Sequence, residues 1–341
     1  MDKSIELQES RYCAVISGHG SYAPPGILTN EDLAKIVETS DEWISTRTGV
    51  KRRHKCSEKE STAHLATEAA KKAIASAGLT AEQIELIIVA TITPEMVFPS
   101  TACFVQQNIG AKNAWAFDLM AACSGFIYGI SIAQQFLESG RIKNALIIGA
   151  ETLTKITNYK DRTSCILFGD GAGAVVLEAK PRTKSKTQSG VIYSTMYSDG
   201  SSWKSLNCQA YGSRHPVSKP LHNPNMVFME IHGREVYQQA VRRIVETVNE
   251  CLEKCKLKLD DVKMIVSHQM NARIIESAAK RLELPPEKYF INIQEYGNTS
   301  AASVPLAFDQ AISEGKINRG DIVILVAFGA GLTWGANVIR F

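Results

Sequence analysis

Short apolar runs alternate along this chain with segments in which apolar residues recur every three or four positions. The runs at 86–90 (LIIVA), 264–267 (MIVS) and 322–327 (IVILVA) predict buried strands. The periodic segments at 62–78 and 234–254 predict amphipathic helices. Because strands that alternate with helices favour mostly parallel sheets covered on both faces, the pattern predicts an α/β protein.

The same order of elements occurs twice, about 175–178 residues apart. Both copies, at 79–154 and 257–333, contain a strand, a helix, a second strand, a turn of small residues, another helix and a third strand. A polar segment at 180–190 (KPRTKSKTQSG) separates them. We therefore expect two duplicated α/β halves, residues 1–182 and residues 183–341.

Composition and charge narrow the class of protein. The 341 residues are 45% hydrophobic, and 38 basic against 35 acidic residues give a net charge of only +3. This balance provides no overall basic field, so we expect no nucleic-acid partner. The first residues (MDKSIELQESRYC) contain no apolar signal region, and the apolar stretch at 322–332 is too short to span a bilayer. We expect a cytoplasmic protein with no membrane segment.

The eight cysteines do not indicate a disulfide framework or a metal site. In a long chain without a signal peptide, cysteines are expected to be free thiols, and most of them to be small buried hydrophobes. The one close pair, Cys251 and Cys255, falls on one face of a predicted helix without a histidine nearby. We expect no metal.

Cys123 stands where a predicted strand gives way to a predicted helix, in FDLMAACSGFIYG (117–129). A helix N-terminus favours a thiolate and lowers the pKa of a cysteine. The adjacent alanines, serine and glycine are small, which leaves room for a carbonyl group to approach the sulfur. Local sequence alone leaves two interpretations equally open, a nucleophile and a buried structural cysteine.

His268 and Asn298 occupy comparable places in the second copy. His268 follows the strand MIVS, and Asn298 precedes the small residues TSAAS at the start of a helix. Each has an ordinary explanation, since Asn is a favoured helix cap. However, the repeat puts both residues and Cys123 at carboxyl ends of strands, where α/β proteins form their sites. We therefore expect the three side chains to converge.

Three glycine-rich segments do not support nucleotide binding. The segment at 18–23 is followed by two prolines where a helix should begin, and those at 168–174 and 328–336 lead into strands. No phosphate-binding loop of the G-x-x-x-x-G-K type occurs. The glycines at 329 and 331 can instead bring backbone N–H groups close to a reacting oxygen.

Taken together, these motifs resemble β-ketoacyl-acyl carrier protein synthase III, a condensing enzyme of the thiolase fold that begins type II fatty-acid synthesis. The strongest matches are AACSGF (121–126), HQMN (268–271), YGNTSAAS (296–303) and FGAGLTWGA (328–336). Further matches are TSDEWISTRTGVKRR (39–53), FPSTACFVQQNIGA (98–111), DRTSCILFGDGAGAVVLE (161–178) and GREVYQQAV (233–241). The resemblance covers nearly the whole chain beyond about residue 12, and it implies five layers in the order αβαβα.

The resemblance also implies a mechanism. Cys123 would take an acyl group from acyl-CoA, because a thiolate attacks a thioester readily and the acyl-enzyme divides the condensation into two easier steps. His268 and Asn298 would bind the thioester oxygen of malonyl-acyl carrier protein while it loses CO2. The N–H groups of Cys123 and Ala330 would form the oxyanion hole for acyl transfer. No cofactor is implied beyond the substrates.

Further residues are assigned by resemblance only. The contacts to CoA would come from Trp43, Arg47, Thr48 and Arg162. The acyl pocket would contain Phe98, from the partner of a homodimer, together with Met120, Met270 and Leu332. The acidic carrier protein would dock on the predicted basic helix through Arg273, Lys280 and Arg281.

Some positions depart from the family pattern, and rival functions stay open. Met270 stands where alanine is common and Leu332 where phenylalanine is common, so we expect these two residues to influence the preferred acyl chain. A degradative thiolase would carry a second cysteine in the C-terminal glycine loop, and an elongating synthase would carry a second histidine. A polyketide starter synthase with the same three residues is the main alternative. A cysteine hydrolase and a non-catalytic acyl-CoA-binding module are the alternatives from other classes.

Overall fold

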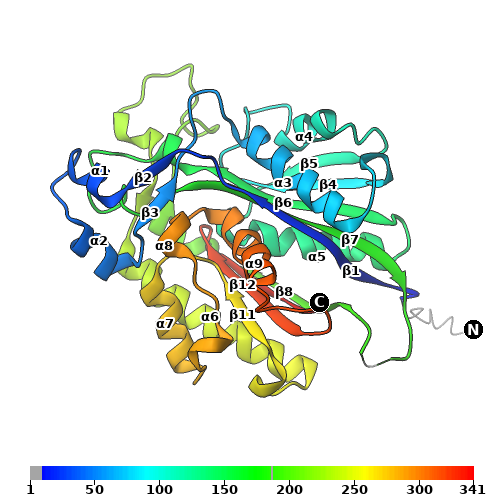
Figure 1. The fold of residues 1–341 in the computed structure, drawn as a ribbon. Coiled ribbons are helices and arrows are strands. Elements are labelled where there is room, and N and C mark those ends of the chain that lie inside the picture. Colours follow the sequence, from blue (N-terminus) through cyan, green and yellow to red (C-terminus); the bar gives the residue numbers. More distant parts are fainter. Residues whose placement is uncertain (1–9, 186) are drawn as a thin grey trace, which may run out of the picture.

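The computed structural model describes residues 10–185 and 187–341, which contain two mixed sheets (Figure 1). The first sheet has the order β1-β7-β6-β4-β5, and the second has the order β11-β12-β13-β8. The strands of the first sheet are β1 (Tyr12–Tyr22), β4 (Leu86–Ala90), β5 (Trp115–Leu119), β6 (Asn144–Thr152) and β7 (Asp170–Pro181). Those of the second are β8 (Gly190–Ser198), β11 (Met264–Ser267), β12 (Ile322–Gly329) and β13 (Thr333–Arg340).

The sheets are less parallel than the sequence pattern predicted. β4 pairs in parallel with β5 and β6, and β11 pairs in parallel with β12. The other pairs, β1 with β7, β6 with β7, β12 with β13 and β13 with β8, are antiparallel. The prediction of mostly parallel sheets was wrong because β13 follows β12 after only three residues, too few for the crossover that a parallel pair needs.

Helices cover and separate the sheets, which gives the five layers αβαβα that the resemblance implied (Figure 1). The outer face of the first sheet is covered by α3 (Thr62–Ala77) and α4 (Thr101–Ile109). The layer between the sheets is formed by α5 (Gly125–Glu138) and α9 (Ser303–Ser313), which contact both sheets. The outer layer of the second sheet is formed by α6 (Gly233–Cys255) and α7 (Ala272–Arg281). Phe126 of α5 and Phe308 of α9 are fully buried in the core between the sheets.

Shorter elements lie around this framework. They are β2 (Ile27–Thr29), β3 (Arg52–His54), β9 (Leu206–Asn207), β10 (Glu230–Ile231), α1 (Asn30–Ala34), α2 (Asp41–Thr48) and α8 (Ile293–Tyr296). Two short 3₁₀ turns, η2 (Ala122–Ser124) and η8 (Ser300–Ala302), precede the central helices.

The internal repeat is visible in the structure, because corresponding elements of the two halves begin 178 residues apart. The corresponding pairs are β4 with β11, α5 with α9, and β6 with β12. The segment KYFINI, expected to be the second strand of the second copy, forms only a single bridge between Tyr289 and Ile265. The side chain of Gln269 replaces ladder bonds there, because its Nε2 donates to Phe290 O (3.0 Å) and its Oε1 accepts from Asn292 N (3.0 Å).

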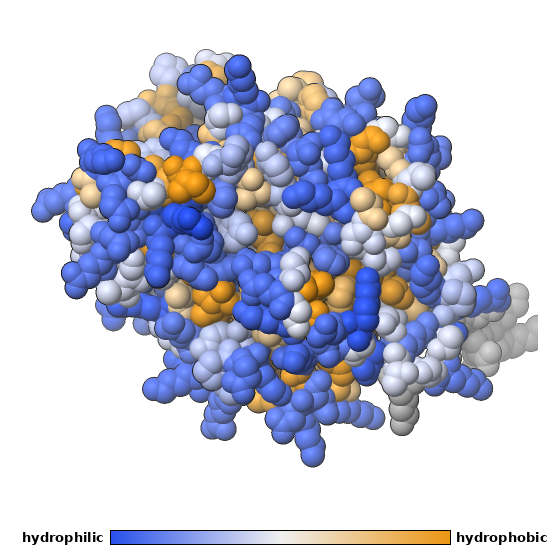
Figure 2. Space-filling view, in the orientation of Figure 1, coloured by the Kyte–Doolittle hydropathy of each residue, from blue (hydrophilic) through white to orange (hydrophobic). Residues whose placement is uncertain are grey.

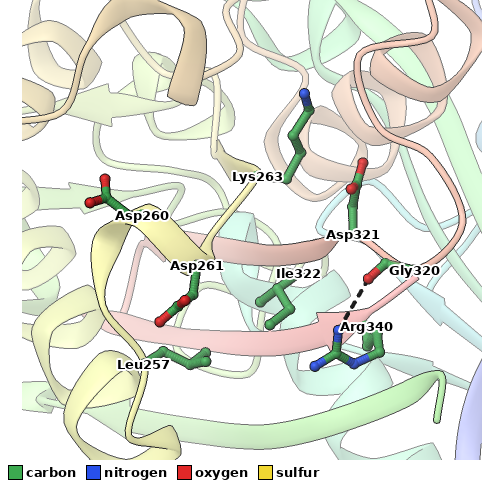
Figure 3. Close-up of a pocket in the computed structure, with 8 residues that line it drawn as sticks. All are labelled: Leu257, Asp260, Asp261, Lys263, Gly320, Asp321, Ile322 and Arg340. Atoms are coloured by element: carbon green, nitrogen blue, oxygen red, sulfur yellow. Dashed lines mark hydrogen bonds between the residues drawn. The ribbon is translucent and has the colours of Figure 1, made fainter. Parts of the chain in front are cut away.

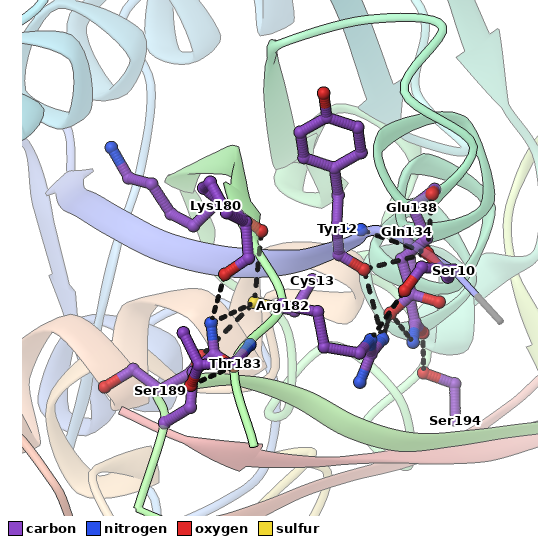
Figure 4. A network of polar contacts seen from close by, with 12 residues as sticks. Ser10, Tyr12, Cys13, Gln134, Glu138, Lys180, Arg182, Thr183, Ser189 and Ser194 are labelled. Carbon is purple, nitrogen blue, oxygen red and sulfur yellow. Dashed lines mark hydrogen bonds and ion pairs between the residues drawn. The ribbon is translucent and has the colours of Figure 1, made fainter. Parts of the chain in front are cut away.

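The polar segment between the two sheets is held by side chains (Figure 4). Arg182 donates from Nε to Ser10 O (3.1 Å) and from Nη2 to Tyr12 O (3.1 Å), and it pairs with Glu138. The first sheet uses strands that end by residue 181 and the second uses strands that begin at residue 190. The expected division into residues 1–182 and 183–341 falls between these two groups of strands and stays a prediction.

Hydrophobic residues are scattered over the face of the molecule drawn in Figure 2. Figure 2 shows a mostly hydrophilic face on which hydrophobic residues form small separate patches. Across residues 10–185 and 187–341, no helix combines the length and the apolarity needed to cross a bilayer. All eight cysteines are free thiols within the described chain.

Candidate active site

Cys123 lies in the turn η2, two residues before α5 begins. The turn forms because Ala122 adopts a left-handed φ of 45° and Ser124 N donates to Ala121 O (3.1 Å). The helix N-terminus was expected to lower the pKa of the thiol. Burial outweighs that effect and raises the pKa of Cys123 to about 12. The resting sulfur is therefore a thiol, so a nucleophilic role requires a group that removes its proton.

The end of β12 packs directly against Cys123. A Cβ atom at Gly329 would lie 2.7 Å from Cys123 N and 3.1 Å from Cys123 Cβ, so only glycine allows this approach. Thr333 Oγ1 donates to Ala121 O (3.0 Å), and Ser124 Oγ donates to Thr333 O (3.0 Å). The glycine turn that contains Ala330 is thereby fixed beside the cysteine.

His268 continues β11 by one residue, since its N–H donates to Val326 O on β12 (2.9 Å). The side chain is buried, and Nδ1 has no hydrogen-bond partner within the described residues. Burial lowers the pKa of His268 to about 3, because the charged imidazolium loses its hydration. The imidazole is therefore neutral at pH 7 and able to donate one hydrogen bond.

Asn298 is held by both its backbone and its side chain. Its N–H donates to Leu167 O (2.8 Å), and its carbonyl oxygen accepts from Gly169 N (3.0 Å). Its side-chain Oδ1 accepts from Ser300 N (2.9 Å), which orients the amide with Nδ2 as the remaining donor group.

These contacts bring the expected residues into one region. Cys123 touches Gly329 at the end of β12, and β12 pairs with the residue that precedes His268. The turn η2 also contacts η8, which begins two residues after Asn298. The site therefore forms where the carboxyl ends of strands from both halves meet.

Glu151 also belongs to this region, although the sequence analysis did not single it out. It stands near the end of β6 and is fully buried. Its carboxylate accepts hydrogen bonds from Thr93 Oγ1 (2.6 Å), Thr91 Oγ1 (3.2 Å) and Ile92 N (3.2 Å). Burial raises the pKa of Glu151 to about 7. The sequence feature that could have pointed to Glu151 was the position of an acidic residue directly after the apolar run LIIGA.

The residues predicted to bind CoA gather at α2. The guanidinium carbon of Arg47 lies 4.5 Å from the centre of the Trp43 ring, and that of Arg162 lies 4.9 Å from it. Thr48 is different, since it is only 3% exposed and its hydroxyl donates to Ile44 O (2.7 Å). Its hydroxyl thus stabilises the end of α2, and its predicted contact with CoA stays a prediction.

The four residues predicted for the acyl pocket fall into two groups. Met270 and Leu332 are buried in the same apolar cluster under α6. Phe98 and Met120 are 79% and 75% exposed, near the edge strand β5. An exposed position is compatible with a side chain that reaches into a partner subunit.

The three basic residues predicted for carrier docking lie on α7, and all are exposed. They are Arg273, Lys280 and Arg281. Asn271, at the start of α7, donates from Nδ2 to Arg47 O (3.1 Å), so α7 is joined to the helix that carries the predicted CoA contacts.

A surface hollow of about 510 Å³ lies elsewhere, at the start of β12 and the end of β13 (Figure 3). Most of its charged groups already have partners. Asp261 accepts from Lys258 N (2.7 Å), Asp321 accepts from Asn318 N (2.8 Å), and Arg340 donates to Gly320 O (3.2 Å). The hollow is at the opposite strand ends from His268 and is separate from the candidate site.

Comparison with known proteins identifies the family. Two family models match, "3-Oxoacyl-[acyl-carrier-protein (ACP)] synthase III" at residues 117–200 and its C-terminal model at residues 252–341. A curated relative from Caldanaerobacter subterraneus subsp. tengcongensis, named β-ketoacyl-[acyl-carrier-protein] synthase III, is 51% identical over 97% of this chain and 98% of its own length.

Solved structures extend the comparison. The 3-oxoacyl-[acyl-carrier-protein] synthase III of Aquifex aeolicus is 47% identical, with a TM-score of 0.87 over 96% of this chain and all of that one. The priming β-ketosynthase of the R1128 polyketide pathway is 30% identical, with a TM-score of 0.89 over 98% of both chains. With this agreement in sequence, fold and length, the chain belongs to the β-ketoacyl-acyl carrier protein synthase III family.

Proposed function

We propose that this chain catalyses the decarboxylative Claisen condensation of an acyl-CoA primer with malonyl-acyl carrier protein, the initiating step of type II fatty-acid synthesis. One observation carries the proposal: Cys123 is held against a glycine turn at the meeting point of both halves, together with a neutral His268 and an oriented Asn298. The relatives named β-ketoacyl-[acyl-carrier-protein] synthase III support the same reaction.

In the first half-reaction, Cys123 takes the acyl group. Its sulfur attacks the thioester carbon, and the N–H groups of Cys123 and Ala330 stabilise the oxyanion that forms. Gly329 supports this role because it allows the turn that bears Ala330 to approach the cysteine backbone.

In the second half-reaction, His268 and Asn298 bind the thioester oxygen of the malonyl group. Loss of CO2 leaves an enolate, whose carbon attacks the acyl-cysteine. A neutral imidazole and an amide stabilise the enolate oxygen by hydrogen bonds, and neither is acidic enough to protonate the carbon. The lowered pKa of His268 supports this role. Besides the two substrates, the chemistry needs no cofactor or metal.

Substrate delivery is assigned to the adjoining helices α2 and α7. Trp43, with Arg47 and Arg162 near its ring, would receive the adenine of CoA. The exposed cations Arg273, Lys280 and Arg281 would receive the acidic acyl carrier protein. The hydrogen bond between Asn271 and Arg47 supports a shared entrance for both substrates.

We also propose a homodimer and a cytoplasmic location. The exposed side chains of Val97, Phe98 and Met120 lie beside the edge strand β5, and Asp118 on that strand accepts from Thr101 N at the start of α4 (2.6 Å). Apolar side chains this exposed favour a partner subunit, whose acyl pocket would receive Phe98. Eight free thiols favour the cytoplasm.

The likeness to a priming β-ketosynthase of a polyketide pathway favours one alternative, a starter synthase that uses another malonyl donor. The test is product formation from a panel of acyl-CoAs with either malonyl-acyl carrier protein or malonyl-CoA. We expect a β-ketoacyl-acyl carrier protein from the first donor. Product only from malonyl-CoA would replace the proposal with the polyketide alternative, and free acid as the only product would indicate a hydrolase.

A further inference from the structure

Glu151 is a fully buried acid to which the mechanism above gives no role. Its hydrogen-bond donors, two threonine hydroxyls and the N–H groups of Ile92 and Thr93, are all neutral. Burying a carboxylate without a cationic partner is costly, and this cost raises the pKa of Glu151 to about 7. Near neutral pH the carboxyl group can therefore both accept and release a proton.

Ser300 begins the turn η8, which contacts both η2, where Cys123 lies, and β6, which carries Glu151 near its end. The Ser300 hydroxyl lowers the pKa of both the Cys123 thiol and the Glu151 carboxyl, whereas the charge of Glu151 raises the pKa of the thiol. Ser300 Oγ is buried, and within the described chain no partner meets the normal geometry of a hydrogen bond to it. Because a hydroxyl can donate one hydrogen bond while it accepts another, Ser300 can join the two groups.

The backbone holds this hydroxyl in place. Ser300 has a left-handed φ of 47°, and its N–H donates to Asn298 Oδ1 (2.9 Å). Ala122, at the equivalent position of the first half and next to Cys123, has a φ of 45°. Such conformations are costly for residues other than glycine and cluster at functional sites.

We propose that Glu151 accepts the thiol proton of Cys123 through the Ser300 hydroxyl when Cys123 is acylated. The inference rests on the proposed function. As the new S–C bond forms, the proton leaves Sγ for Ser300 Oγ, and the proton of Ser300 passes to Glu151. When the bond between the acyl carbon and the sulfur of CoA breaks, that sulfur takes up the proton by the reverse path. The products are acyl-Cys123 and CoA thiol, and Glu151 returns to its ionised form.

Other titratable groups of this region are poorer candidates for the proton acceptor. Asp170 starts β7 opposite Thr152, but its carboxylate accepts from Cys56 N (2.8 Å) and from Thr154. Glu95 accepts from Ala63 N (3.0 Å). His268 directly follows β11 of the second sheet, and its low pKa makes it a poor base. This leaves Cys123 as the proton donor and Glu151 as its acceptor.

The test is the single-turnover rate of Cys123 acylation, measured by rapid quench and intact mass between about pH 5.5 and 9. The wild-type rate should rise with pH around 7, because only ionised Glu151 can accept the proton. Glu151→Gln and Ser300→Ala should lose this rise and be slowed about 100-fold at pH 8. Glu151→Asp keeps the carboxyl group and should keep the rise.

The matched control is Asp170→Asn, which neutralises the other buried acid, at the start of the neighbouring strand β7. It should lower the unfolding temperature and leave the pH profile unchanged.

An unchanged profile in Glu151→Gln, or in Ser300→Ala, would overturn the proposal, as would a loss of the rise in Asp170→Asn. If Glu151→Gln does not fold, the pH profiles of Ser300→Ala and Glu151→Asp test the proposal instead. A wild-type protein that forms no adduct would overturn the proposed function and the relay together, whereas variants that match an active wild type would overturn the relay alone.

Discussion

A single methyl group added at Gly329 should separate β12 from the cysteine turn. In Gly329→Ala, the new Cβ would lie 2.7 Å from Cys123 N, about 0.7 Å inside the 3.4 Å at which ordinary van der Waals contact begins. The atoms it meets are the backbone and Cβ of Cys123, so rotation of a flexible side chain cannot relieve the clash. Either β12 or η2 must move by about that distance.

The expected loss follows from this displacement. Overpacking of a well-packed region costs about 1–3 kcal/mol of folding free energy. A shift of this size also moves the N–H of Ala330 relative to Cys123, and a misplacement near 1 Å can cost about 100-fold in rate. We therefore expect Cys123 acylation to slow about 30- to 100-fold, with a lower unfolding temperature.

Acylation is measured by intact mass after rapid quench, and stability by thermal unfolding. Gly200→Ala is the matched control, because a Cβ there meets no atom within 4 Å. It should retain both the rate and the unfolding temperature. Acylation of Gly329→Ala at the wild-type rate would refute the reasoning, since it would mean that Cys123 does not depend on its contact with β12.

Four further changes test other parts of the account. His268→Ala should still be acylated while malonyl decarboxylation falls about 100-fold, and unchanged condensation would remove His268 from the mechanism. Met270→Ala should change the relative rates with short and long acyl-CoAs, whereas an unchanged profile would place this side chain outside the pocket. Arg273→Glu combined with Lys280→Glu should raise KM for malonyl-acyl carrier protein at least about tenfold, and an unchanged KM would exclude α7 as the docking helix. Because the pKa of Glu151 is raised from 4.5 to about 7, wild-type stability should fall by about 3 kcal/mol as pH rises through this interval. Glu151→Gln should reduce that fall, as measured by denaturant unfolding at pH 5 and pH 8, and an equal fall in both proteins would contradict the raised pKa.

The internal repeat made much of the fold predictable. The apolar runs LIIVA and MIVS became β4 and β11, and the small-residue turns became η2 and η8 before the two central helices. The mostly parallel pairing was wrong because sequence periodicity marks strands without fixing their direction. The hairpin between β12 and β13 depends on a three-residue connection within one apolar, glycine-rich stretch. Likewise, the bonds that Gln269 makes in place of a strand ladder arise only after distant segments meet.

The candidate site was likewise predictable from the sequence only in part. Cys123, His268 and Asn298 could be grouped from the sequence because the repeat places them at corresponding strand ends. The protonated state of Cys123 could not be predicted, since it depends on burial by residues from both halves. No residue close to Glu151 in the sequence suggests a chemical role for it. Its environment forms when η8 of the second half packs beside β6 of the first.

The most direct test of the central claim is the intact mass of the protein after a brief incubation with acyl-CoAs and then with malonyl-acyl carrier protein. We expect one acyl adduct that maps to Cys123, is absent in Cys123→Ser, and is discharged by the malonyl donor as a β-ketoacyl-acyl carrier protein. An adduct on another residue, or undiminished acylation of Cys123→Ser, would contradict the central claim.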